Sequence, residues 1–511
     1  MIDPITLEVA RNRFSAIADE MGVVLRRTSL SPNIKERADC SAAVFDAEGQ
    51  MLAQAEHIPV HLGSMPASVE ACLDRFEPVP GVQYAVNDPY HGGTHLNDLT
   101  ILAPVFVGGR HVAWVANRAH HADVGGEAPG SMPAHATRLD QEGHVVSPMV
   151  AVRDGVWADE FLAPFLGASR TPWERRGDLD GQMGANAVAV RRLTELVESE
   201  GIPRFREVAA ALLDYGERRT RSALAELPDG VYRFEDSMEL GDRDIVIRVA
   251  VTVDGEHLTA DFSGSDEQVE ANFNAVEAVT RSCLYYAVRV ASDPTIPASG
   301  GCYRPIQLVA PPGSIVNARP PAAVAAGNVE TSQRIADVLL GALAQAAPGR
   351  VPAAGQGTMN NVLIGNDDFA YYETVAGGQG ARPFRDGQSG IHTGMTNTQN
   401  TPIESLHDHY PFRVRAYTLR RGSGGAGRYR GGDGIRRELE FTADATLSLM
   451  GERRRNHPWG LAGGGPGATG EDWLVHGDGS RERLAGKTTV PVSAGDHLIV
   501  LTPGGGGWGS P

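Results

Sequence analysis

Three strand-like segments near the start of the chain finish in polar residues, and this pattern predicts a fold built on a β-sheet. Residues 41–55 read as two short strands around a turn at 46–49, and residues 81–93 as a strand that enters the loop DPYHGG. A third strand, within residues 111–126, runs into the polar turn HHADVGG. Loops held by a rigid sheet often carry active sites. We therefore expect the chemistry of this chain where these strands end.

Helical and hairpin patterns alternate through the rest of the chain, which predicts an α+β fold. Apolar residues recur at helical spacing over five stretches: 4–27, 64–76, 186–226, 275–291 and 329–347. A hairpin-rich stretch precedes the last two, and its Asp254-Gly255 pair is a strong hairpin signal. From residue 411 onward, glycine turns alternate with short strands.

The overall charge and the cysteines narrow the class of protein. A net charge of −17 argues against a nucleic-acid partner, because phosphate binding needs a basic face. The first residues lack the basic-then-apolar order of a signal peptide, and no apolar run approaches the ~20 residues that a membrane helix needs. We expect a cytoplasmic protein with reduced thiols, because no motif spacing links its four cysteines: Cys40, Cys72, Cys283 and Cys302.

Glycine-rich strings that could suggest nucleotide binding do not have the required context. Two GxGxxG strings start at Gly422 and Gly465, but each is followed by turns and strands instead of the helix that a dinucleotide site needs. The segment AGKTT at 485–489 resembles half a phosphate-binding loop, yet the leading glycine position holds Arg481. We therefore expect that this chain does not bind ATP by itself.

Histidines and aspartates gather at the strand ends and predict a metal centre. Seven of the 16 histidines fall between His91 and His144. A single histidine or aspartate in a loop usually caps a turn or faces water, but a cluster is harder to explain in this way. Two imidazoles with two carboxylates form a mixed nitrogen and oxygen site, which suits zinc, manganese or ferrous iron. The candidates, with His57 and His61 nearby in sequence, are Asp39, His95, Asp98, His120, His121 and Asp123.

The length of the chain and this cluster predict a domain organisation. A chain of 511 residues is too long for one ordinary core, so roughly two to four domains are expected. We predict a β-rich, multi-domain α+β architecture in which strand-end loops carry the metal site. The predicted units are an N-terminal metal-site domain (1–220), a hairpin-rich α+β region (221–330), a helix-containing middle region (331–410) and a glycine-rich β region (411–511).

A series of long motifs extends from near residue 36 to the C-terminus. They are NDPYHGGTHLNDLT, AHHADVGG, GCYRPI, NVETSQRIADVLLGALA, GQGTMNN, TNTQNTPIESL and TPGGGGWG. In sequence and in order these motifs resemble those of the hydantoinase B/oxoprolinase family, which includes subunits of ATP-dependent hydantoinases and related subunits of acetone and acetophenone carboxylases.

The resemblance implies a reaction divided between two subunits. A hydantoinase A-type partner with an ATPase fold phosphorylates the carbonyl oxygen of a cyclic amide, and the B-type subunit opens the activated ring with water at a metal site. The family's metal ligands correspond to Asp39, His95, Asp98 and His120 in this sequence. The choice of His120 over His121 rests on the resemblance.

The remaining polar residues of these loops are candidates for catalytic roles. His121 and Asp123 are expected to handle protons, and Asn97 could donate to a developing oxyanion. The alternative is that all three support the metal ligands. Two departures from the family pattern, at Ser299-Gly300 and at residues 325–328, put a standard hydantoin substrate in doubt.

Three functions are compatible with these predictions. The first is the metal-dependent subunit of an ATP-dependent hydrolase of cyclic amides such as hydantoin, oxoproline or a lactam. The second is a subunit of an ATP-dependent ketone carboxylase of the acetone or acetophenone type, which an adjacent third small subunit would favour. The third is a scaffold without catalytic function, which a metal-free chain would favour. The sequence names neither the exact substrate nor the metal, nor the stoichiometry of the complex.

Overall fold

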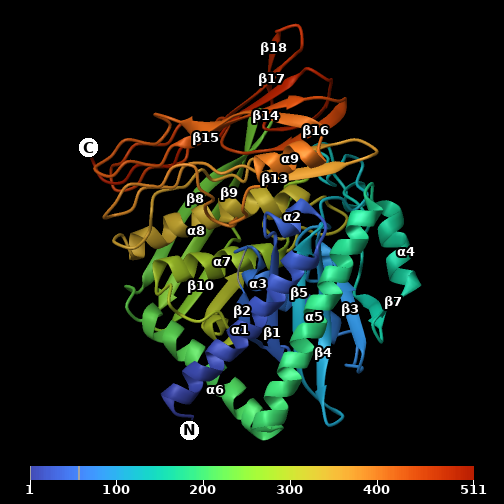
Figure 1. Ribbon diagram of the computed structural model, residues 1–511. Coiled ribbons are helices and arrows are strands. Elements are labelled where there is room, and N and C mark those ends of the chain that lie inside the picture. Colours follow the sequence, from blue (N-terminus) through green and yellow to red (C-terminus); the bar gives the residue numbers. More distant parts are fainter. Residues whose placement is uncertain (1, 56–57) are drawn as a thin grey trace.

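The computed structural model describes residues 2–55 and 58–511, and a seven-stranded antiparallel sheet organises its N-terminal part (Figure 1). The strand order is β2-β1-β5-β4-β3-β6-β7. The strands are β1 (Cys40–Asp46), β2 (Met51–Ala55), β3 (Val82–Val86), β4 (Asp98–Val107), β5 (Arg110–His120), β6 (Met149–Arg153) and β7 (Val156–Trp157). The predicted hairpin over 41–55 is confirmed as β1 and β2, with Gly49 at φ 80° in the turn between them.

Helices cover both faces of this sheet, so side chains from both faces are buried. In β1, Ala42 and Val44 face a core that contains residues of α1, α5 and α6, whereas Ala43 and Phe45 face a second core that contains α3. This alternation is the two-residue period of a strand. The helices are α1 (Pro4–Thr28), α2 (Pro32–Lys35), α3 (His61–Leu73), α4 (Asp159–Ala168), α5 (Pro172–Glu200) and α6 (Ile202–Leu224).

The long helical stretch predicted over 186–226 is two helices that meet at Gly201. Helix α5 starts earlier than predicted. The sequence pattern missed its first half, because the buried face there is polar and shows no apolar periodicity. Asp178, Gln182 and Asn186 are fully buried there and hydrogen-bonded to the chain beside them. The predicted helix over 4–27 is confirmed as α1, whose first turn is capped by the Asp3 carboxylate.

A second, four-stranded sheet has the order β11-β10-β9-β8, and two helices lie beside it (Figure 1). Asp254-Gly255 forms the predicted tight connection between β9 and β10. Helix α8 packs on β8 and β9 and follows a short π-helical turn at Gly327–Thr331. The elements are β8 (Gly230–Leu240), β9 (Arg243–Asp254), β10 (His257–Asp261), β11 (Ile306–Val309), α7 (Glu277–Ala291) and α8 (Ser332–Ala346).

Two further sheets form the C-terminal part, drawn in orange and red at the top of Figure 1. Their orders are β13-β12-β16-β19 and β14-β15-β20-β17-β18, and they share one core. The elements are β12 (Asn361–Gly365), β13 (Ala370–Thr374), α9 (Ile403–His409), β14 (Phe412–Arg420), β15 (Gly434–Phe441), β16 (Ala445–Met450), β17 (Glu471–Val475), β18 (Arg481–Leu484), β19 (Lys487–Val492) and β20 (His497–Leu501).

The first of these sheets combines strands from both sides of residue 411. The division of the chain into four domains at 220, 330 and 410 stays a prediction. The α+β class is confirmed, because helices and several separate sheets alternate along the chain. Among the described residues, no helix combines the length and apolar character needed to cross a bilayer.

Direct contact between backbones explains the glycine-rich C-terminal strings. A Cβ atom added to Gly504 would lie 2.0 Å from the carbonyl oxygen of Ser423, and one added to Gly507 would lie 2.1 Å from that of Ala426. Real Cβ atoms do not approach oxygens this closely, so glycine is required. Within the GxGxxG strings that start at Gly422 and Gly465, Gly424 and Gly467 belong to this backbone packing, and both strings are followed by strands or turns.

Candidate metal centre

Strand register brings the predicted ligands to one edge of the seven-stranded sheet. Asp98 opens β4 and pairs directly with His120, the last residue of β5. The next strand, β1, begins one residue after Asp39, whose carbonyl oxygen accepts the backbone N–H of His120 at 3.0 Å. His95 lies in the loop that enters β4. Three neighbouring strand ends therefore carry the four residues, as the sequence predicts.

His95, Asp98 and His120 point their ligand atoms at one another. His95 Nε2 lies 3.2 Å from His120 Nδ1, and the Asp98 carboxylate lies 3.5 Å from His95 Nδ1 and 3.4 Å from His120 Nδ1. Two ligands of one tetrahedral zinc ion, at bond lengths of about 2.0–2.1 Å, lie about 3.3 Å apart. All three residues are buried. The triad thus has the donor types and spacing of a metal site.

The imidazole of His95 is kept neutral by burial, and both imidazoles of the triad are only partly hydrogen-bonded. Burial lowers the pKa of His95 to about 3, with smaller effects from the charges around it. His95 Nδ1 and His120 Nε2 are buried and have no hydrogen-bond partner among the described residues. A metal ligand must be deprotonated, so a neutral His95 suits that role at pH 7.

Asp98 is held in its charged form by its neighbours. Burial opposes ionisation, but His95 and hydrogen bonds from His120 and His61 hold the pKa of Asp98 well below its usual range. His61, at the start of α3, lies 3.3 Å from Asp98 through Nε2 and 2.8 Å from the Ser41 hydroxyl through Nδ1. Thr94 also donates to Asp98, at 2.8 Å. His61 therefore belongs to this centre, although the sequence did not assign it a role; His57 lies outside the described residues.

Asp39 contributes to the same cavity but stands apart from the triad. Its carboxylate is not part of the group of ligand atoms that lie within 4.8 Å of one another. Burial raises the pKa of Asp39, against the opposing influence of His120 and Arg37. The cation beside it, Arg37, donates hydrogen bonds to Asn33, Thr374 and the carbonyl of Tyr372.

The cavity at the centre has a volume of about 20 Å³, which is enough for one water-sized guest. Much of its wall comes from residues far away in the sequence, within the motifs NVETSQR and TNTQNT and in β13. The Tyr372 ring stacks on His120 with ring centres 4.5 Å apart, and the Asn328 side-chain oxygen is buried with no hydrogen-bond partner among the described residues. The sequence flagged these motifs but gave their residues no role. The distant lining residues are Asn328, Val329, Met359, Tyr372, Thr374, Thr396 and Thr398.

His121, Asp123 and Asn97 are all buried near the triad and engaged in other contacts. His121 Nε2 lies 3.0 Å from Gln182 Oε1, and burial lowers the pKa of His121 to about 4. Asp123 accepts hydrogen bonds from Arg170 at 2.9 Å and from backbone N–H groups. The Asn97 amide donates to the carbonyl of His121. These contacts suit the alternative role of supporting the loops, and the proposed proton-transfer and oxyanion roles stay predictions.

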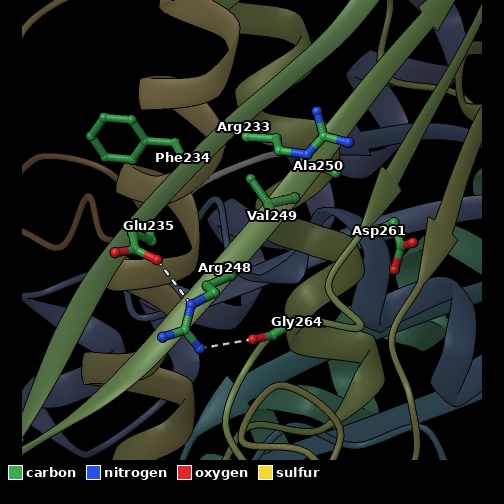
Figure 2. A pocket seen from close by; sticks show the side chains of 8 residues that line it. All are labelled: Arg233, Phe234, Glu235, Arg248, Val249, Ala250, Asp261 and Gly264. Carbon is green, nitrogen blue, oxygen red and sulfur yellow. Dashed lines mark hydrogen bonds and ion pairs between the residues drawn. The ribbon is translucent and has the colours of Figure 1, made fainter.

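A larger cavity, of about 430 Å³, lies on the second sheet and has different chemistry. Figure 2 shows its lining residues, which come from β8, β9, the end of β10 and the loop that follows. Arg248 there donates to Glu235 at 2.9 Å and to the Gly264 carbonyl at 2.9 Å, so its charge is already partnered. None of its described lining residues belongs to the metal centre. The small cavity at the triad is therefore the better candidate for chemistry.

The fold and the centre define an α+β protein with a buried histidine–aspartate site at a sheet edge. The family model of hydantoinase B/oxoprolinase matches residues 3–511, and the chain belongs to this family. An uncharacterized protein of Methanocaldococcus jannaschii is 42% identical over 100% of this chain and 91% of its own length. A putative D-/L-hydantoinase subunit of the B type, from a Pseudomonas species, is 31% identical over 100% of this chain and 90% of its own length. The 5-oxoprolinase 1 of Arabidopsis thaliana is 38% identical over 99% of this chain, which spans only 42% of that protein.

Solved structures share this fold. The ATP-dependent caprolactamase of Pseudomonas jessenii matches with a TM-score of 0.92 and 29% identity, over 100% of this chain and 92% of that one. An acetone carboxylase in its nucleotide-free form matches with a TM-score of 0.91 and 20% identity, over 99% of this chain and 76% of that one. The second likeness shows the fold alone.

Proposed function

We propose that this chain is the metal-dependent, ring-opening subunit of an ATP-dependent cyclic amide hydrolase. The observation that carries the proposal is the convergence of His95, Asp98 and His120, in a family whose named members include oxoprolinases and a hydantoinase subunit. The substrate class is a hydantoin, an oxoproline or a lactam. The caprolactamase likeness supports a cyclic amide.

The residues of the centre fit one divalent metal, either zinc or manganese, with ferrous iron also compatible. His95, Asp98 and His120 would hold it, and Asp39, which lines the same cavity, would complete the set. A bound divalent metal supplies Lewis acidity and lowers the pKa of water toward neutrality. The protein orients the ligands: Thr94 and His61 hold the Asp98 carboxylate, and Tyr372 fixes the face of His120. Such supporting contacts tune ligand geometry.

ATP would be used by a partner, a hydantoinase A-type ATPase subunit. Amide resonance makes a lactam a poor electrophile, and phosphorylation of its carbonyl oxygen removes that resonance and installs a good leaving group. This chain contains no complete phosphate-binding loop. This chain spans 42% of the Arabidopsis oxoprolinase, so the rest of that single polypeptide is long enough to contain such an ATPase unit. We expect a stable hetero-oligomer with the metal loops at the interface, because a phosphorylated intermediate is protected by exclusion of water.

A ketone carboxylase subunit is the alternative function. The fold does not separate the two, because the caprolactamase and the acetone carboxylase superpose on this chain equally well. The sequence favours the hydrolase, since 5-oxoprolinase 1 is 38% identical whereas the acetone carboxylase is 20% identical.

The test is co-expression of this chain with a hydantoinase A-type ATPase subunit. Hydantoins, oxoproline and lactams are then screened for ring opening coupled to ATP hydrolysis, with metal content measured by elemental analysis. We expect turnover only when both proteins, ATP and metal are present. Steady ring opening by the homogeneous chain without a partner would overturn the division of labour. Size-exclusion runs in which the two proteins always separate, with nucleotide present, would overturn the complex.

A further inference from the structure

A second cavity adjoins the metal centre. It has a volume of about 220 Å³ and is lined by Gln333, Leu340, Ala353, Gln379, His392 and Thr396 among others; we call it the chamber. Thr396 lines both the chamber and the cavity at the triad. The consecutive residues Ile58 and Pro59 line the triad cavity and the chamber, respectively. The two cavities therefore share part of one wall.

One helix and one loop form the walls of both spaces. The π-helical turn contributes Asn328 to the triad cavity, and α8, which continues from it, contributes Gln333 and Leu340 to the chamber. The loop over 392–398 lies against this helix, because Gln333 donates to the carbonyl of Thr393 at 3.0 Å. Gly394 has φ 65°, and a Cβ atom there would lie 2.1 Å from Gln333 Oε1. This packing holds the wall of the chamber in place.

His392 is the polar group of the chamber that lacks a partner. Both of its ring nitrogens are shielded from solvent and have no hydrogen-bond partner among the described residues. Burial, and then the charge of Arg37, lowers the pKa of His392 to about 4, so the ring is neutral at pH 7. A neutral imidazole offers one donor and one acceptor. Leaving both unused in a buried position is costly, and a ligand with complementary groups would remove that cost.

The charge of the chamber selects the kind of ligand. Among the described residues that line it there is no arginine or lysine. Its one carboxylate, Asp337, is already paired with Arg453 at 2.7 Å. Apolar groups such as Leu340 and Ala353 form the rest of the surface beside neutral amides and hydroxyls. Arg382, outside the lining, donates to Gln379 at 3.2 Å. A carboxylate placed in the chamber would lose its hydration without an arginine or lysine among the described lining residues to pair with it, which is unfavourable.

We propose that the chamber binds the ring of an uncharged cyclic amide and that His392 positions it by hydrogen bonding, with the reacting carbonyl directed toward the metal centre. This inference rests on the proposed function and narrows its substrate class. Cyclic amides without a carboxylate are preferred over 5-oxoproline. His392 is a positioning residue, and the metal ligands carry the chemistry.

The test is ligand binding to the full, metal-loaded chain without ATP or partner, measured by calorimetry or by ligand-detected NMR. The probes are 5-oxoproline and 5-oxoprolinamide, which share one ring and differ in the carboxylate. We expect the amide to bind at least about 10-fold more tightly, and His392→Ala to weaken amide binding by about 5- to 10-fold. His91→Ala is the matched control, since His91 is an exposed histidine outside the chamber. Equal or tighter binding of 5-oxoproline, or unchanged amide affinity in His392→Ala, would overturn the proposal.

Two further variants test whether His392 acts by hydrogen bonding and whether charge sets the preference for the amide. His392→Gln keeps a donor and an acceptor, so it should retain most of the amide affinity if His392 acts through hydrogen bonds. Asn397 is an exposed residue at the chamber, and Asn397→Lys should reduce the preference for the amide by adding a cation. If His392→Ala does not fold, an unchanged preference in Asn397→Lys contradicts the proposal. Binding without ATP-coupled turnover would refute the proposed function and leave the chamber standing, whereas turnover with 5-oxoproline as the preferred substrate would refute the chamber alone.

Discussion

Two clusters of ionisable residues in this protein differ in how their charges are paired. The metal centre contains His95, Asp98 and His120, and two of its ring nitrogens have no hydrogen-bond partner among the described residues. The second cluster, which we call the arginine–carboxylate cluster, joins β8, α8 and the segment after β16. It contains three acids and three bases: Asp236, Asp337, Glu452, Arg334, Arg453 and Lys487.

The difference between them separates a ligand site from a structural junction. Arg453 donates to Asp236 at 2.7 Å and to Asp337 at 2.7 Å, so one cation pairs with two carboxylates. In the metal centre, one carboxylate and two imidazoles converge at 3.2–3.5 Å, and none of the three residues is an arginine or a lysine. A carboxylate beside imidazoles whose ring nitrogens are partly unpartnered is suited to bind a metal cation. Burial alone thus says little about function, whereas the balance of charges within a cluster says much.

The largest effect should come from breaking the arginine–carboxylate cluster. Arg453→Met leaves Asp236 and Asp337 buried without their shared cation, which should cost about 3–5 kcal/mol in the free energy of unfolding. Denaturant unfolding of the purified chain measures it. Arg455→Met is the control, because Arg455 is an exposed arginine paired with Asp244 and should change stability by about 0–1 kcal/mol. Equal losses in both variants would remove the distinction between buried and exposed pairs.

The next effect is specific to metal binding. His95→Ala or His120→Ala removes a neutral donor, and metal affinity should fall by at least about 10–100-fold, measured by elemental analysis after dialysis. Asp39→Ala should also lose metal if Asp39 completes the ligand set. His121→Ala should retain metal and slow ATP-coupled turnover if that residue handles protons. Wild-type metal content in His95→Ala, or loss in His121→Ala with retention in His120→Ala, would show that the site is assigned wrongly.

A smaller effect concerns pH and extends the comparison to the chamber. The folded-state pKa of His392 is about 4, below the ordinary value of 6.5, so the unfolded chain binds the proton more readily. The stability that a neutral His392 contributes is present above pH 6.5 and is lost as pH falls toward 4. Between pH 7 and 5 the wild type should lose up to about 2 kcal/mol more than His392→Gln. Denaturant unfolding at both pH values measures this difference. Equal losses of unfolding free energy in the wild type and His392→Gln would refute a neutral His392 ring in the folded protein.

The smallest effect tests the support of the metal centre. Tyr372→Phe removes the hydroxyl that donates to Asn361 Oδ1 at 2.9 Å but keeps the ring that stacks on His120. We expect a loss of about 1 kcal/mol in the free energy of unfolding and unchanged metal content. Thermal unfolding and elemental analysis measure the two. Loss of metal in Tyr372→Phe would mean that the hydroxyl acts at the centre itself.

Local patterns accounted for elements whose cause is local. The turn after β1 and the Asp254-Gly255 connection each depend on residues within a few positions, and each is as predicted. The first half of α5 was missed, because its buried face is formed by Asp178, Gln182 and Asn186. Their burial is possible only because partners from β3, β4 and the segment after α1 satisfy them.

By itself, the sequence determined the α+β class, the strand-end loops and the candidates His95 and Asp98, because these depend on residue type and short spacing. The choice of His120 over His121 rested on the family resemblance. Only the tertiary structure decided that His61 holds Asp98, that Tyr372 stacks on His120, and that His392 faces a chamber beside the metal centre. His61 and Asp98 are 37 positions apart, whereas the contacts of Tyr372 and His392 join segments hundreds of residues apart. These long-range contacts arise because β13 and the loop over 392–398 lie beside N-terminal residues in the walls of the two cavities, and no short-range pattern in the sequence encodes that packing.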